Sequence, residues 1–453
     1  MNDGIAGDCG TSPGGIASRR EVVAWAFYDF ANSGYTTVVL TTIYGAYFVA
    51  VIAAGTDQNS PGTATLLWTM AVAAANFCVL LSAPVVGAIA DLRAMKKPFL
   101  FITTVVCVVA TVLLGQAGPG AVALAMFLLI ISAMAFATGE NLIAAFLPEI
   151  AASDKMGRVS GYGWSLGYFG GLLTLGCCLA YISLATGRGQ QAEDYVPGTL
   201  LITACIFGLA AAPTFLWLRE RAVPKVLPQG YSYLRFGFAQ VRQTLLHAAH
   251  YRDLFRFLLC LTAFQSGVAT VVVIAAIYAQ EVMGFDSQQL ILLIMLVNLT
   301  AAFGAFMFGF AQDHFGSIPS LCVALLVWMA AIVVTFFADR PTDLWLAGNL
   351  MGLAMGATQS GGRALIGRLT PEGRSAEFFG LWGLASRTAA ILGPLSYGVT
   401  SRLSGGDHRI ALLSTMMFFV VGLALLLTVD EHRGTTVREQ APPTSGKSGS
   451  PAG

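Results

Sequence analysis

Long apolar segments recur along almost the whole chain and constrain its fold more than any other feature. They lie at residues 22–53, 65–90, 98–115, 120–147, 159–185, 198–218, 254–280, 287–311, 317–338, 343–367, 376–402 and 408–429. Each is close to or above the roughly 20 residues that an α-helix needs to cross a bilayer. Because backbone polar groups in lipid must be satisfied within the segment, such segments form helices. The sequence therefore predicts an all-α, polytopic membrane protein with twelve transmembrane helices.

Composition supports this class and excludes several others. Hydrophobic residues make up 56% of the chain and charged residues only 11%, which is incompatible with an ordinary soluble domain. The formal net charge is +1 and no block of like charge occurs, so we expect the lipid bilayer and no nucleic acid as a partner. No phosphate-binding loop, metal-ligand cluster or nucleophile–base set is recognisable. We therefore expect no cofactor, no metal site and no enzymatic activity. We also expect the protein to be a monomer.

One long connection, residues 219–253, separates six apolar segments from six. We expect a disordered tail at 1–20, a six-helix bundle at 21–218, a linker with an amphipathic helix at 219–253, a second six-helix bundle at 254–429 and a disordered tail at 430–453. Two sequence pairs recur in the two halves at almost the same offset, Asp91 with Asp313 and Pro148 with Pro371. Such a repeat indicates a duplicated six-helix unit.

The distribution of Lys and Arg predicts the orientation in the membrane. With the N-terminus in the cytoplasm, nearly all of them fall in cytoplasmic segments. The exceptions are Arg188, Arg340, Arg402, Arg409 and the mid-span Arg387. By the positive-inside rule, both termini of this multi-pass protein are then cytoplasmic. We expect the protein in the cell (inner) membrane.

An aspartate interrupts the first apolar segment. Asp29 is the only ionisable acid or base between Val22 and Ala54. A charge at mid-span costs on the order of 2.5–3.5 kcal/mol on insertion scales, so such residues usually face a bundle interior or an aqueous cavity. Asn32 lies one turn further along the helix, and Tyr28 precedes Asp29. This stripe favours a solute or coupling site; the alternative is an aspartate held by neighbouring hydroxyls for packing alone.

Polar residues in later segments extend the candidate site. They are Glu140, Asn141, Gln265, Gln359, Arg363 and Arg387. Glu140 and Asp29 each lie roughly 10–12 Å from a helix end, at 1.5 Å per residue. Arg387 is too deep to reach the membrane surface and needs an acidic partner, for which Glu140 is the first candidate. Arg363 is close enough to its helix end to snorkel, which is the alternative to a site role.

The second apolar segment ends in a recognisable pattern. Residues 87–97 read G-x-x-x-D-x-R-x-x-K-K, which resembles the loop between helices two and three of the major facilitator superfamily. The resemblance implies two pseudo-symmetric halves of six helices. It also implies gating roles at the cytoplasmic seam for Gly87, Asp91 and Arg93, and the repeat adds Asp313. Leu92 departs from the pattern, because the superfamily usually has a basic residue there.

Four further segments narrow the resemblance. They are 25–35 (WAFYDFANSGY), 141–150 (NLIAAFLPEI), 160–171 (SGYGWSLGYFGG) and 376–393 (AEFFGLWGLASRTAAILG). Together they look like the bacterial branch of the autophagy-related vacuole effluxer family. Fungal members export amino acids from the vacuole, so the resemblance implies amino-acid transport as a first hypothesis. Ser266-Gly267 stands where family members often have Asp-Gly, which puts an acidic role there in doubt.

The leading hypothesis is a secondary transporter of a small polar or zwitterionic solute. It would rock two halves about a site at the membrane midplane, as repeat-built transporters do. Asp29 and Glu140 are the candidates for binding and releasing a proton during the cycle. The alternatives are a non-transporting membrane factor for assembly or sensing and an exporter of a larger amphipathic solute.

Overall fold

All regular secondary structure in the described residues is helical, as the sequence predicts. The computed structural model describes residues 17–56, 63–225, 227, 231–246, 251–285, 287–404, 408–431 and 433, so most of the two predicted tails lies outside it. The first half contains α1 (Arg19–Tyr35), η1 (Thr36–Thr42), α2 (Ile43–Tyr47), η2 (Phe48–Ile52), η3 (Ala54–Thr56), α3 (Thr63–Arg93), α4 (Lys96–Leu114), α5 (Val122–Ala144), α6 (Leu147–Ile150), η4 (Ser153–Lys155), α7 (Met156–Thr186) and α8 (Ala192–Trp217). After α9 (Tyr233–Leu246), the second half contains α10 (Arg252–Glu281), α11 (Ser287–Phe315), α12 (Ser317–Phe336), α13 (Pro341–Leu369), α14 (Ser375–Leu403), α15 (His408–Ser414) and α16 (Met416–Leu426).

Ten helical segments in the described residues are long and apolar enough to cross a membrane. The other two long helices, α13 and α14, have 29 residues each but a lower mean hydropathy, because polar side chains interrupt them. With these two, the helices agree in number and order with the twelve predicted spans. These two helices carry Gln359, Arg363 and Arg387.

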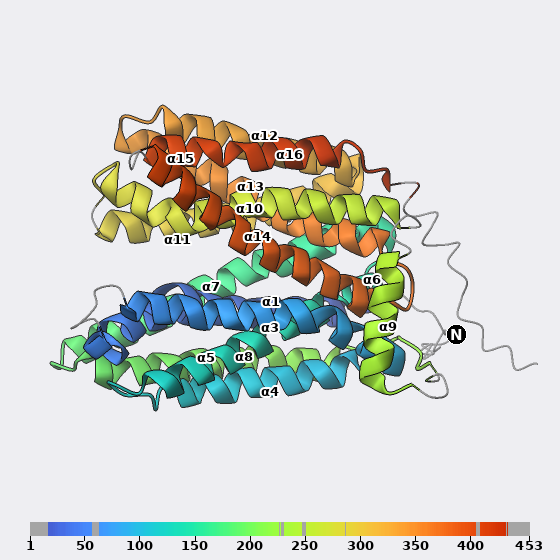
Figure 1. Cartoon of the computed structure of the whole chain (residues 1–453), viewed down its shortest axis with the longest axis horizontal. Helices are drawn as coiled ribbons and strands as arrows, with labels where there is room; N and C mark the ends of the chain where they lie inside the picture. The colour runs from blue at the N-terminus through green and yellow to red at the C-terminus, as the bar shows by residue number, and fades with distance from the viewer. Residues whose placement is uncertain are drawn as a thin grey trace, which may run out of the picture.

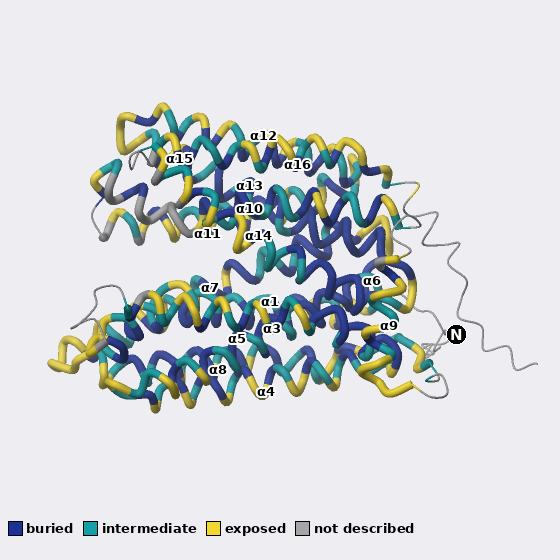
Figure 2. Tube along the Cα trace, viewed as in Figure 1, coloured by how far each residue is buried: buried dark blue, intermediate teal, exposed yellow. Residues whose placement is uncertain are grey.

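The long helices form two groups that lie side by side (Figure 1). Helices of the first half, coloured blue to green, pack on one another, and helices of the second half, coloured yellow to red, do the same. The groups touch along two seams, where α7 packs on α11 and α13, and α3 packs on α14. Buried residues are dense at one end of these seams (Figure 2).

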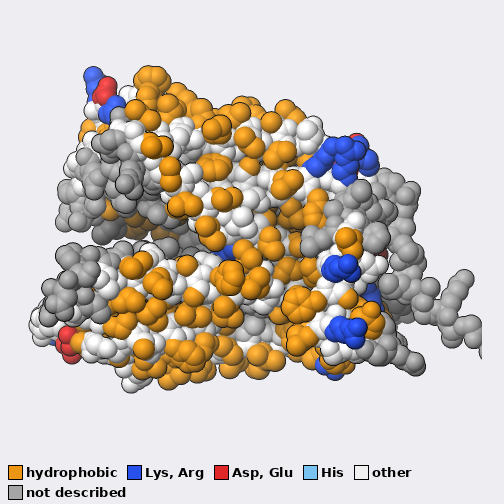
Figure 3. Space-filling view, in the orientation of Figure 1, with side chains coloured by type: hydrophobic (Ala, Val, Ile, Leu, Met, Phe, Trp, Pro, Cys, Tyr) orange, Lys and Arg blue, Asp and Glu red, His pale blue; other side chains and the backbone are white. Residues whose placement is uncertain are grey.

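The two ends of the molecule differ in charge. Lys and Arg side chains gather mainly at the end where α9 lies, whereas the sides of the helices are covered by hydrophobic side chains (Figure 3). Leu209, Leu216 and Phe127 are among the large apolar residues exposed there, as expected for surfaces in contact with lipid. We call the end with α9, Arg93, Lys96 and the start of α14 the basic end, and the other the opposite end.

Candidate functional site: a polar cavity and the contacts beneath it

Arg387 of α14 and Glu140 of α5 form an ion pair across the two halves. The distance from Arg387 Nη2 to Glu140 Oε2 is 2.9 Å. The pair is not sealed from its surroundings, because the side chains are 19% and 29% exposed. The partner expected for Arg387 from the sequence is therefore the one found in the structure.

This pair lines a small polar cavity between the halves. The cavity has a volume of about 110 Å³ and is lined by Glu140 and Asn141 from α5, Trp164 from α7, Gln265 from α10, Gln359 from α13, and Trp382, Gly383, Ser386 and Arg387 from α14. Gly383, Ser386 and Arg387 share one face of α14 because they are three and four residues apart. Gln265 Nε2 donates to Gln359 Oε1 at 3.0 Å, so the two predicted amides meet.

Glycine at position 383 lets α5 approach α14 beside the cavity. A Cβ atom there would lie 2.7 Å from Asn141 Cγ, so any other residue would force the Asn141 side chain to move. The side chain of Asn141 occupies that space.

Five polar atoms on the cavity lining are buried and form no hydrogen bond with a described residue. They are Asn141 Nδ2, Trp164 Nε1, Gln265 Oε1, Ser386 Oγ and Arg387 Nε. A buried polar atom left unpaired costs about 1–3 kcal/mol, so such atoms are uncommon unless a ligand or water completes them. Three of the five are N–H donors, one is an acceptor, and the hydroxyl can serve as either. The cavity thus offers an occupant several donors beside the Glu140 carboxylate.

A second ion pair lies one helical turn nearer the basic end. Arg363 Nη1 donates to Asp29 Oδ2 at 2.6 Å. Arg363 also donates to both oxygens of Ser160, through Nε to the hydroxyl at 3.1 Å and through Nη2 to the carbonyl at 2.9 Å. Its guanidinium lies over the rings of Trp25, at 4.6 Å, and Trp164, at 5.4 Å. Arg363 is only 3% exposed and does not snorkel.

Gly163 of α7 makes this second pair possible. A Cβ atom at that position would lie 2.6 Å from Arg363 Nη2 and 2.8 Å from the Trp25 ring, and it would also collide with the Asp29 carboxylate. Any larger residue at position 163 would displace these three side chains from their present positions.

The two predicted carboxylates have separate arginine partners. Glu140 lines the cavity, whereas Asp29, Asn32 and Arg363 do not. Trp164 links the two places, because it lines the cavity and also covers Arg363. Arg363 follows Gln359 by one turn of α13, so the Asp29–Arg363 pair lies directly beneath the cavity on the side of the basic end.

Tyr28 does not reach the cavity, contrary to the expectation from the sequence. Its hydroxyl bonds the hydroxyl of Thr104 in α4 at 2.7 Å, and its ring packs edge-on against Phe207 and Phe215 of α8. Neighbouring residues on a helix point about 100° apart, so Tyr28 cannot share the face of Asp29. It belongs to the core of the first half.

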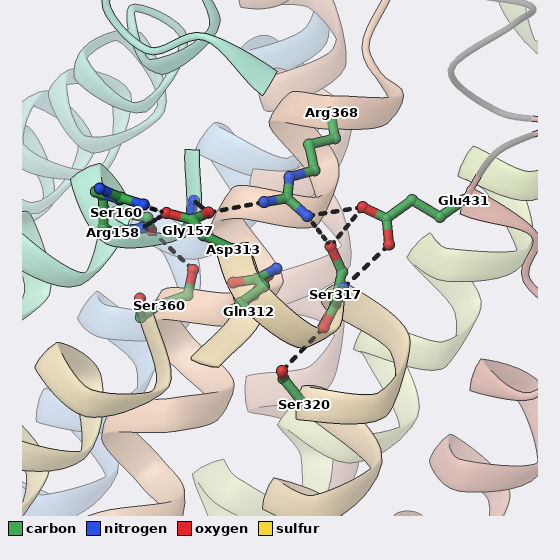
Figure 4. Close-up of polar contacts among 12 residues, drawn as sticks. Gly157, Arg158, Ser160, Gln312, Asp313, Ser317, Ser320, Ser360, Arg368 and Glu431 are labelled. Carbon is green, nitrogen blue, oxygen red and sulfur yellow. Dashed lines mark hydrogen bonds and ion pairs between the residues drawn. The ribbon is translucent and has the colours of Figure 1, made fainter. Parts of the chain in front are cut away.

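At the basic end, two aspartates each bind the start of a helix from the other half. Asp91 of α3 accepts hydrogen bonds from the N–H groups of Ala376 at 3.1 Å and Glu377 at 2.9 Å, in the first turn of α14. Asp313 of α11 accepts from the N–H groups of Gly157 at 2.8 Å and Arg158 at 3.0 Å, in the first turn of α7 (Figure 4). Helix starts carry unpaired N–H groups and a partial positive charge, so each carboxylate satisfies both. We call these two contacts the basic-end junction.

Glycine permits the close approach on the α14 side of the junction. A Cβ atom on Gly87 would lie 2.9 Å from the Glu377 nitrogen and would collide with the Ala376 carbonyl. Close packing of α3 on the start of α14 therefore requires a residue without a side chain at position 87, one turn before Asp91.

Buried basic residues that we did not single out from the sequence complete the junction. Lys96 pairs with Glu149, lies 3.7 Å from Asp91 and donates to the Ser375 hydroxyl at 2.9 Å. Only its place in the K-K of the motif marks it in the sequence. Arg93, expected at this seam, instead stacks over the Tyr233 ring of α9 at 4.7 Å.

Arg368 plays the matching part beside Asp313 (Figure 4). It binds Asp313 through Nη2 at 2.8 Å, and through Nη1 it binds Glu431 and the Ser317 hydroxyl, both at 2.7 Å. Nothing in the local sequence pattern distinguishes Arg368 from an ordinary helix-end arginine, because its partners are 51 to 63 residues away.

Solved structures with this arrangement of helices define the class of protein. The proton:xylose symporter XylE aligns with a TM-score of 0.73 at 14% identity, covering 93% of this chain and 97% of that one. The human organic anion transporter MFSD10 aligns with a TM-score of 0.69 at 14% identity, covering 90% and 99%. These likenesses show the fold, which is that of a major facilitator superfamily transporter.

The sequence comparisons add the family. The chain belongs to the vacuole effluxer Atg22-like family, whose model matches residues 62–439. The MFS-type transporter YxiO of Bacillus subtilis is 27% identical over 419 residues, covering 92% of this chain and 96% of YxiO. Autophagy-related protein 22-1 of Aspergillus niger is 25% identical over 308 residues, covering 63% of this chain and 48% of that protein, so the match spans about half of this fungal relative. The protein is a polytopic transporter of the MFS type, not an enzyme.

Proposed function

We propose that this transporter carries a small polar or zwitterionic solute, with a small amino acid as the first candidate, by alternating access between its two halves. The observation that carries the proposal is the cavity at the seam, with its five unpaired polar atoms beside the Glu140–Arg387 pair. Groups from both halves line it, so a bound solute would contact both halves at once. Such a position suits a site that rocking halves expose to each side in turn.

Size and chemistry both favour a small solute. The cavity volume of about 110 Å³ is well below the roughly 300–1,000 Å³ of pockets that hold drug-sized ligands. The Trp164 and Asn141 N–H groups and the Arg387 guanidinium suit a carboxylate on the solute. The Glu140 carboxylate and the Gln265 carbonyl oxygen suit an ammonium group.

We assign gating to the basic-end junction and to the Asp29–Arg363 pair. The two halves are joined at the basic end by the contacts of Asp91 and Asp313. A solute in the cavity must pass both the ion pair and the junction to leave at the basic end. If the basic end is cytoplasmic, as the positive-inside rule predicts, this conformation is closed on the cytoplasmic side.

We further propose proton coupling through the two carboxylates. Protonation of Asp29 would remove the charge that holds Arg363 and so loosen the contact beneath the cavity. Glu140 would couple in a different way, because a proton and a solute ammonium group compete for the same carboxylate.

The test is counterflow in proteoliposomes with labelled glycine, alanine, serine and larger amino acids. We expect exchange of the small ones, and in Ser386→Ala a KM about 10-fold or more higher, since a hydrogen bond to a charged group contributes about 1.5–3 kcal/mol. Thr388→Ala is the matched control, because the Thr388 hydroxyl bonds only the Leu384 carbonyl of its own helix. Absence of exchange for every amino acid would overturn the substrate class, and equal effects of the two variants would remove the cavity from the mechanism.

One observation favours a second candidate, export of a larger amphipathic solute. An apolar groove of about 1,080 Å³ lies between α1, α7 and α11, walled by side chains such as Phe27, Phe30 and Phe303. It lies outside the polar cavity and is large enough for an alkyl chain. Counterflow with a labelled amphipathic amine in the same vesicles separates the candidates, because Ser386→Ala should leave that transport unchanged.

A further inference from the structure

The helix in the long connection, α9, touches both halves at the basic end. On one side, Gly237 packs against α3, and a Cβ atom there would lie 2.8 Å from Val85 Cγ1. On the other side, the hydroxyl of Thr244 donates to the carboxylate of Glu377 and accepts from Arg374. Glu377 is one of the two residues whose N–H groups bind Asp91. The inner face of α9 therefore supports the α3–α14 side of the basic-end junction.

The outer face of α9 combines apolar and basic side chains. Leu234, Phe238, Arg242 and Leu246 recur every four residues and so form one stripe, with Arg235 beside it. The three apolar members are 64%, 62% and 66% exposed. The helix contains two arginines and no acid. Among the described residues, no ion pair engages Arg235 or Arg242.

The position of α9 in the molecule indicates what its outer face contacts. Figure 1 shows α9 lying across the basic end, in front of the ends of the spanning helices. In Figure 3, Lys and Arg side chains alternate with hydrophobic ones at that place, level with the ends of the apolar helix sides. Because the apolar helix sides end at this level, a membrane surface would run alongside α9 and could be met by its outer face. A helix face that combines exposed apolar side chains with arginines is typical of helices that bind anionic bilayers.

We propose that α9 is a lipid-sensing helix, whose outer face binds a bilayer surface rich in anionic headgroups and thereby stabilises the basic-end junction. Leu234, Phe238 and Leu246 enter the interface, while Arg235 and Arg242 meet lipid phosphates. Arg93 stacks on Tyr233 at the start of α9 and adds a third positive charge near the same surface. Because the inner face holds Glu377 through Thr244, lipid binding outside favours the conformation in which Asp91 binds α14. The inference is independent of the solute proposed above.

The test is hydrogen exchange of the full-length protein in lipid nanodiscs, with phosphatidylcholine alone or mixed with phosphatidylglycerol. Phosphatidylglycerol should slow amide exchange in residues 233–246 and in the first turn of α14. An arginine near an anionic surface contributes about 1 kcal/mol, so we expect about a five-fold change per arginine. The double variant Arg235→Gln/Arg242→Gln should lose this lipid dependence, and 0.5 M salt should have the same effect on the wild type by screening.

Arg188→Gln is the matched control, because Arg188 is an exposed arginine in the turn between α7 and α8, at the opposite end. It should retain the full lipid response. Phe238→Ser should weaken protection equally in both lipid compositions, since it removes apolar contact without removing charge. The proposal is overturned if phosphatidylglycerol does not alter exchange in wild-type α9, or if the double variant responds as the wild type does. The salt experiment decides the question without any variant.

Discussion

Two arginines reach across the seam to carboxylates of the first half, and their surroundings are very different. Arg363 is 3% exposed, lies between two indole rings and uses all three nitrogens on Asp29 and Ser160. Arg387 is 19% exposed, lines the cavity and leaves its Nε unpaired. The same pairing chemistry thus produces a contact in which every guanidinium nitrogen is bonded in one place, and a contact with an unpaired nitrogen a short distance away. The incomplete pair is the one that lines the polar cavity.

The largest expected effect separates the two carboxylates by function. On the proposed mechanism, Asp29→Asn imitates a permanently protonated Asp29, so solute exchange should continue while accumulation driven by a proton gradient is lost. Glu140→Gln should instead raise the KM of both processes, because Glu140 lines the cavity. Exchange and driven uptake are measured in the same proteoliposomes. If Asp29→Asn only lowers the melting temperature and leaves the ratio of the two activities unchanged, Asp29 has a packing role.

The next effect concerns stability. Arg363→Gln leaves Asp29 buried without a cationic partner, and breaking a buried pair in this way costs about 3–5 kcal/mol of unfolding free energy. Arg387→Gln should cost nearer to 1 kcal/mol, as for partly exposed pairs. Denaturant titration in detergent micelles compares the two variants. Equal losses would mean that the difference in exposure has no energetic consequence.

A smaller effect is expected from a methyl group beside the Asp29–Arg363 pair. Gly163→Ala puts a Cβ atom where Arg363 and the Trp25 ring now lie, and such overpacking costs about 1–3 kcal/mol. Gly176→Ala in the same helix is the control, because a Cβ atom there meets nothing within 4 Å. That control should be neutral or slightly stabilising, since alanine favours helix by up to about 1 kcal/mol. Thermal unfolding of the two variants side by side gives the answer.

The smallest expected effect is the coupling energy of the partly exposed Glu140–Arg387 pair. A double-mutant cycle on Glu140→Gln and Arg387→Gln should give a coupling energy of about 0.5–1 kcal/mol, at the low end for residues in contact. The same cycle on Asp29→Asn and Arg363→Gln should give a larger value. Strict additivity in the first cycle would show that the 2.9 Å contact contributes nothing in solution.

The sequence was sufficient for the helices and for part of the site. Hydropathy and length gave the spans, because lipid admits little else than helix in a long apolar segment. The depth of Arg387 required an acid, and Glu140 is that acid. Gln265 and Gln359 meet because both lie at corresponding depths in helices that face the cavity.

Other contacts depend on tertiary packing and could not be read from local pattern. Arg363 pairs with a residue 334 positions away, and its two indole neighbours come from α1 and α7. Tyr28 could have been excluded from helical phase alone, since it directly precedes Asp29. Lys96 and Arg368 look like ordinary helix-end cations until their buried carboxylate partners are in view.

The basic-end junction contains the same kind of contact twice, with the roles of the two halves exchanged. Asp91 of the first half binds the start of α14, and Asp313 of the second half binds the start of α7. These two contacts lie on opposite seams. When the halves rotate as rigid bodies, one contact cannot open while the other stays closed. Their energies therefore add within a single equilibrium between two conformations. Weakening either one by about 1.4 kcal/mol shifts the ratio of the two populations about tenfold and creates no half-open intermediate. On the proposed alternating-access mechanism, variation at one aspartate would set how much time the transporter spends facing each side of the membrane.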